Sequence, residues 1–175
     1  MTRTGDVGAA EGTTQAQQPD YTGAIYGSLL AASVIVGAAV GAHDESDLRP
    51  LRLAILLVVT GLVFWLAHGY ARLVGQRIRH SALDFRQIRR VVRREWPLLE
   101  AALPPAAAAL LFGLLGASNA AAAWAALIVA IAGQVGWATI TTIRTGAGAP
   151  LVVLSAVVNL LLGLVIVLLK TALHH

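Results

Sequence analysis

Four polar side chains within otherwise apolar stretches are the groups in this chain that could do chemistry: His68, Glu100, Gln134 and Asn159. A titratable group inside a bilayer indicates a function by default, because the cost of removing it from water must be offset. His68 and Glu100 are expected at similar depth, near one membrane surface, on adjacent spans. With Gln134 and Asn159 deeper, they would form an inward-facing polar track for a proton, an ion or a small solute.

A structural interpretation of the same residues is favoured over the track. Glu100 would extend to the interface and meet an arginine, His68 would be a satisfied interfacial residue, and Asn159 would join two helices by a hydrogen bond. The outer halves of the apolar stretches hold almost no polar residue, so the track would end inside the membrane. His68 with Glu100 is too little for catalysis, and no enzyme activity, cofactor or metal is predicted. The absence of cysteine excludes thiolate chemistry.

A second group of residues is a dense run of arginine. Eight of the twelve arginines lie between Arg72 and Arg94. Within 81–96, apolar residues recur at helical spacing, and this periodicity predicts a basic amphipathic helix whose apolar stripe faces the acyl boundary. A basic cluster beside apolar spans favours anionic lipid headgroups, or a docked protein partner, over nucleic acid. The predicted contact residues are Arg86, Arg89, Arg90, Arg93 and Arg94.

The elements that must position these side chains are stretches long enough to cross a bilayer. A helix rises about 1.5 Å per residue, so roughly 20 apolar residues span the hydrocarbon core. Of the 175 residues, 57% are apolar and 13% are charged. The predicted fold is an all-α polytopic transmembrane bundle of about five helices with one basic amphipathic interfacial helix. After a disordered tail at 1–20, a single domain covers 21–175, with spans at about 21–42, 53–71, 97–116, 119–141 and 150–169.

Orientation follows from the positive-inside rule, which places basic loops in the cytoplasm. The 72–96 segment is strongly basic, whereas the 43–52 loop carries His43, Asp44, Glu45 and Asp47 against two arginines. The amino terminus is therefore predicted to be cytoplasmic and the carboxyl terminus external. The preference for Arg over Lys, with abundant Ala and Gly, indicates GC-rich codons and a bacterial plasma membrane.

Helix packing is predicted from small residues at four-residue spacing, which allow close approach in lipid. The first span contains Gly23 with Gly27 and Gly37 with Gly41. These pairs could also support a homo-oligomer or a contact with another membrane protein. Pro104 and Pro105 fall within the third span and predict a kink or local unwinding.

The run from Val63 to Arg72, the segment Glu95 to Glu100 and the Pro104-Pro105 pair resemble small integral membrane proteins of actinobacteria. The resemblance covers most of 21–173 and implies a bacterial membrane protein without an activity to transfer. The predicted function is a non-enzymatic multi-pass membrane component that engages anionic lipid or a protein partner. The alternative is a small channel or transporter that uses the polar track.

Overall fold

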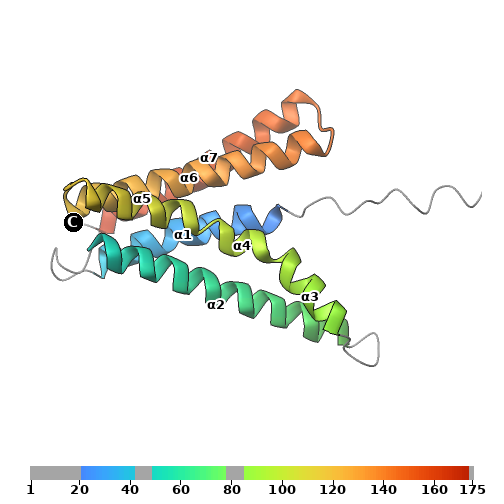
Figure 1. Ribbon diagram of the computed structural model, residues 1–175. Coiled ribbons are helices and arrows are strands. Elements are labelled where there is room, and N and C mark those ends of the chain that lie inside the picture. The colour runs from blue at the N-terminus through green and yellow to red at the C-terminus, as the bar shows by residue number, and fades with distance from the viewer. Residues whose placement is uncertain (1–20, 42–48, 78–84, 174–175) are drawn as a thin grey trace, which may run out of the picture.

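The chain folds as a bundle of helices. A computed structural model describes residues 21–41, 49–77 and 85–173, and this part of the chain contains helices and no strand (Figure 1). The predicted tail at 1–20 and most of the acidic loop lie outside the described residues. The helices are α1 (Thr22–Val40), α2 (Pro50–Arg77), α3 (Phe85–Arg94), α4 (Trp96–Glu100), α5 (Leu103–Leu114), α6 (Asn119–Arg144) and α7 (Ala149–Leu173).

Five helical segments are long and apolar enough to cross a membrane: Thr22–Val40, Pro50–Gly75, Ile88–Leu114, Asn119–Arg144 and Ala149–Ala172. The prediction of an all-α bundle with about five spans is therefore confirmed. Successive spans run in opposite directions, and the start of α1 lies at the opposite end of the bundle from the end of α7 (Figure 1). This arrangement is the one that a multi-pass membrane protein requires.

The second span is longer than the predicted 53–71. Helix α2 begins at Pro50, where proline fits the first turn because its missing N–H has no partner there in any helix. The helix continues past Arg72 to Arg77. The prediction counted only uncharged residues, but long arginine side chains can leave a helix end toward water without interrupting it.

The third span is broken, as the proline pair predicts. Helix α4 ends at Glu100 and α5 begins at Leu103, so the break lies one turn before Pro104 and Pro105. Neither proline has an N–H to donate to the carbonyl four residues earlier, at Glu100 and Ala101. Regular bonding resumes when the Ala106 N–H donates to the Ala102 carbonyl at 3.3 Å.

Glycines end α5 and α6 in the same way. Gly116 has φ +77° and Gly146 has φ +72°, a conformation that other residues rarely adopt. After each glycine, the next N–H donates to a carbonyl five residues earlier: Ala117 to Phe112 at 3.0 Å and Ala147 to Thr142 at 3.3 Å. Ser118 then caps α6, because its hydroxyl accepts from the Ala121 N–H.

The core consists mainly of small residues. Helix α1 packs along α6, and α5 lies between α2 and α6. Such close packing of small side chains suits a bundle in lipid, where water exclusion does not drive helices together. Among the largest buried side chains are Ile35 on α1, Leu57 on α2 and Leu127 on α6. Around them lie the buried alanines Ala31, Ala32, Ala54, Ala106, Ala109, Ala123, Ala126 and Ala130.

The two predicted glycine pairs of α1 differ in what they contact. A Cβ at Gly27 would lie 2.4 Å from the Leu98 carbonyl oxygen, and one at Gly23 would lie 3.5 Å from the Leu98 nitrogen, so this pair is a close contact with α4. A Cβ at Gly37 would meet nothing within 4 Å, and one at Gly41 only the carbonyl of Gly37. The second pair therefore makes no close helix contact within the described residues of this chain.

Candidate functional site

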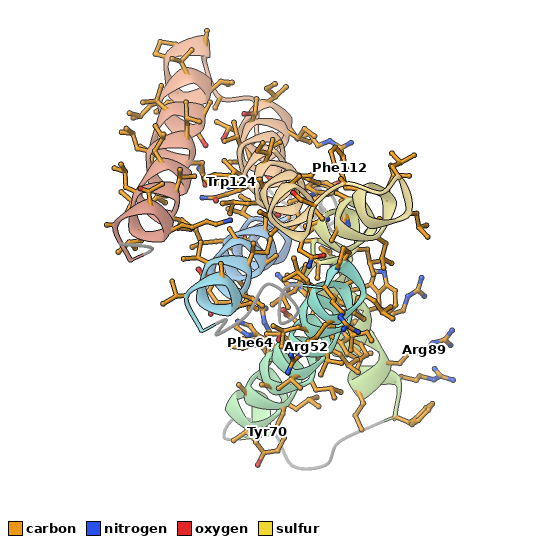
Figure 2. All side chains as sticks on the ribbon, turned by 90° about the vertical axis from the view of Figure 1, so that its left-hand side faces the viewer. Arg52, Phe64, Tyr70, Arg89, Phe112 and Trp124 are labelled. Carbon is orange, nitrogen blue, oxygen red and sulfur yellow. The ribbon has the colours of Figure 1, made fainter. Side chains whose placement is uncertain are left out.

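The arginine helix α3 lies beside the end of α2 and projects past α4 (Figure 1). The five arginines named above are all exposed on it. Figure 2 shows Arg89 pointing away from the bundle. Phe85, at the first position of α3, is 78% exposed, and Trp96 just beyond its last residue is 48% exposed. An exposed basic surface thus has an exposed aromatic side chain at each end.

The apolar stripe of α3 is predicted to face the acyl boundary, and in the structure its central residues pack on α2. Val91 is buried, and Ile88 and Val92 are half-buried. The Trp65 indole N–H donates to the Val92 carbonyl at 3.1 Å. The rings of Trp65 and Trp96 meet edge to face with their centroids 5.9 Å apart. Helix α3 is therefore part of the tertiary structure, while its aromatic ends remain available to a membrane surface.

An ion pair between a buried carboxylate and a half-exposed arginine lies where α3 meets α4. Glu95 is 3% exposed, and its Oε1 lies 2.5 Å from Nε of Arg72 on α2. The sequence did not predict this contact. Glu95 follows a run of arginines, and such a charged segment is usually exposed to solvent. Its position four residues after Val91, on the buried side of α3, is the sequence signal that could have identified it.

Two of the four residues of the predicted polar track are joined by hydrogen bonds. Gln134 is 0% exposed, and its Nε2 donates to both the backbone carbonyl and Oδ1 of Asn159, at 3.3 Å each. Asn159 Nδ2 donates in turn to the Ser155 carbonyl at 2.9 Å. Gln134 Oε1 is buried and has no hydrogen-bond partner in the described chain. These contacts join α6 to α7 near the middle of both helices.

The contacts of His68 and Glu100 are separate from the hydrogen bonds between Gln134 and Asn159. The His68 ring lies 5.5 Å from the Tyr26 ring of α1. Glu100 is exposed at the end of α4, and Arg72 pairs with Glu95. The structure therefore brings together Gln134 and Asn159 and leaves the two titratable candidates outside their hydrogen bonds.

Cations and aromatic rings meet at both ends of α6. Near its start, Lys170 Nζ lies 4.2 Å from the centroid of the Trp124 ring, which Figure 2 labels. Near its end, Arg144 lies over the Tyr21 ring and donates a hydrogen bond to the Tyr21 hydroxyl. Tyr21 also stacks on Trp137, with ring centroids 5.2 Å apart. Amphipathic rings and basic groups at both helix ends are typical of the two faces of a bilayer.

Comparison with known proteins does not name a function. No protein family model, curated protein or solved structure matches this chain. Within the described ranges, no group of three histidine or acidic side chains could hold a metal ion. The site that the geometry defines is the exposed arginine surface of α3, held on a bundle of five candidate membrane spans.

Proposed function

We propose that the protein is a non-enzymatic multi-pass membrane protein whose α3 helix binds anionic lipid headgroups. The observation that carries the proposal is the exposed set of five arginines on α3, which lies at the start of the third candidate span and beside the end of α2 (Figure 1). Arginine donors match the oxygen geometry of phosphate, and each basic residue near an anionic surface contributes about 1 kcal/mol. The exposed rings of Phe85 and Trp96 favour the same surface, because aromatic side chains partition to the headgroup layer.

Native mass spectrometry of the detergent-solubilised protein tests this proposal. Phosphatidylglycerol, an anionic lipid, is titrated against neutral phosphatidylcholine, and bound lipids are counted. The double variant Arg89→Gln/Arg93→Gln should bind phosphatidylglycerol roughly 30-fold more weakly, since two lost contacts correspond to about 2 kcal/mol. Binding by the wild-type protein should weaken as salt is added, because salt screens exposed charges.

A matched control lies at the other end of α2. Arg49→Gln/Arg52→Gln also removes two charges and lowers the formal net charge from +4 to +2. This control should retain most of the phosphatidylglycerol affinity. Equal losses from the two double variants would show that overall charge, and not α3, attracts the lipid. Equally tight binding of glycerol phosphate, which lacks acyl chains, would indicate a site for soluble anions.

The alternative function, a small channel or transporter, has one observation in its favour. The buried Gln134 Oε1 has no hydrogen-bond partner among the described residues, as expected for a group that faces a transported species. The test is proton and monovalent-cation flux in liposomes, with Glu100→Gln and His68→Ala compared with wild type. Because neither residue bonds to the Gln134–Asn159 pair, we expect no flux above that of empty liposomes. Flux that either variant abolishes would favour transport.

The placement of α3 on the cytoplasmic side of a bacterial plasma membrane is part of the same proposal. It rests on the basic 72–96 segment and the positive-inside rule, together with the resemblance to actinobacterial membrane proteins. Anionic lipids on that side would then face the arginine surface.

A further inference from the structure

Helix α3 is attached to α2 by contacts that gather at its carboxyl-terminal end. The Trp65 to Val92 hydrogen bond, the Trp65–Trp96 contact and the Arg72–Glu95 ion pair all involve residues 92–96 of the α3–α4 segment. At the other end, Phe85 is largely exposed. The direction of the whole arginine surface therefore depends on a short anchored segment.

Glu95 is the most costly member of that segment to bury. A carboxylate that is 3% exposed loses most of its hydration, and only close pairing with a cation offsets this loss. Arg72 supplies the cation from the adjacent helix α2. A pair with one half-exposed partner contributes little net stability, but losing Arg72 would leave the buried Glu95 charge without a cation, so a shift of α3 that separates the two is unfavourable.

We infer that the Arg72–Glu95 pair is a positioning contact that holds α3 in the orientation in which its arginines bind anionic lipid. The inference rests on the proposed function and adds an element to it. Glu95 touches no lipid in this scheme. It acts through α3, whose arginine surface it directs away from α2.

The direction in which Glu95→Gln changes phosphatidylglycerol binding distinguishes a positioning role of Glu95 from an effect of net charge. The substitution raises the formal net charge from +4 to +5, so charge alone predicts equal or tighter phosphatidylglycerol binding. A positioning role predicts that phosphatidylglycerol binding weakens roughly fivefold or more, because about fivefold is the lower end of the usual coupling between two sites. Glu100→Gln is the matched control: it makes the same charge change at an exposed carboxylate five residues later and should not weaken binding.

A structural measurement without lipid tests the same inference independently. The chain contains no cysteine, so spin labels can be attached at Leu66→Cys on α2 and Phe85→Cys on α3, both exposed positions. Electron-spin distance measurements should give a narrow distribution in the wild-type and Glu100→Gln backgrounds. The Glu95→Gln background should give a broader or shifted one.

A second variant keeps the test decisive if Glu95→Gln does not fold. Trp65→Phe removes the indole hydrogen bond to Val92, reduces the ring contact with Trp96 and alters no charge, so it should broaden the distances and weaken binding to a smaller extent. Unchanged distances or undiminished lipid binding in folded Glu95→Gln protein would overturn the inference. If Arg89→Gln/Arg93→Gln leaves lipid binding intact while Glu95→Gln still broadens the distances, the proposed function fails but the anchoring role of Glu95 stands.

Discussion

At the residue scale, polar side chains inside the spans make structural contacts. Gln134 is fully buried, and its side-chain nitrogen donates hydrogen bonds to two acceptors on Asn159, the backbone carbonyl and the side-chain oxygen. These two hydrogen bonds fix the orientation of the Gln134 amide, because a flipped amide would place its oxygen against the two acceptor oxygens of Asn159.

A double-mutant cycle measures the Gln134–Asn159 contact. We expect Gln134→Leu and Asn159→Leu to show a coupling energy of about 0.6 kcal/mol, and at most about 1.7, the range found for hydrogen bonds between membrane helices. The measurement is equilibrium unfolding in mixed micelles for the wild type, both single variants and the double variant. Additive single effects would mean that α6 and α7 associate by packing alone.

At the element scale, helix contacts depend on where glycines lie relative to a neighbour and not on their spacing alone. Gly27 lies directly against the backbone of α4, whereas Gly37 has open space around it. The same distinction applies to α7. A Cβ at Gly163 would lie 2.6 Å from Ile131 Cγ2, so the α6–α7 pair also depends on a glycine.

Paired alanine substitutions test this difference between two glycines of one helix. Gly27→Ala should destabilise the protein by about 1–3 kcal/mol, because α1 and α4 must separate to admit the methyl group. Gly37→Ala should be neutral or stabilising by up to about 1 kcal/mol, because alanine favours helix and meets no neighbour. Thermal unfolding in detergent compares the two variants. Similar effects would contradict a specific α1–α4 contact.

At the scale of the whole molecule, the bundle has cation–aromatic contacts at two levels along its length. Trp124 with Lys170 and Tyr21 with Arg144 lie at opposite ends of α6. Positions 124 and 144 are twenty residues apart, and a rise of about 1.5 Å per residue separates them by about 30 Å. That length matches the hydrocarbon core of a bilayer, so the two levels are consistent with its two interfaces.

Orientation can be measured by cysteine labelling, since the natural chain has no cysteine. Ser118→Cys and Gly148→Cys place single thiols in the turns at opposite ends of α6. In intact cells, a membrane-impermeant maleimide should label Ser118→Cys and spare Gly148→Cys until the cells are opened, because the basic side is expected inside. The reverse pattern would place the arginine helix outside and remove its access to cytoplasmic anionic lipid.

The sequence by itself determined the helical class and the number of segments long enough to span a membrane. Length and hydropathy are local properties, and they suffice because a helix in lipid satisfies its own backbone. The Pro104-Pro105 pair and the glycines at 116 and 146 likewise act within one or two turns. A break in the third span was therefore predictable from the residues at that position.

Only the tertiary structure decided which side chains meet. Glu95 and Glu100 are both carboxylates beside arginines in the sequence, yet one is buried against Arg72 and the other is exposed. Gly27 and Gly37 have the same local spacing, but only one faces α4. These outcomes depend on how helices rotate about their axes and which neighbours they have. That choice is made by packing between segments far apart in the chain, and no local pattern records it.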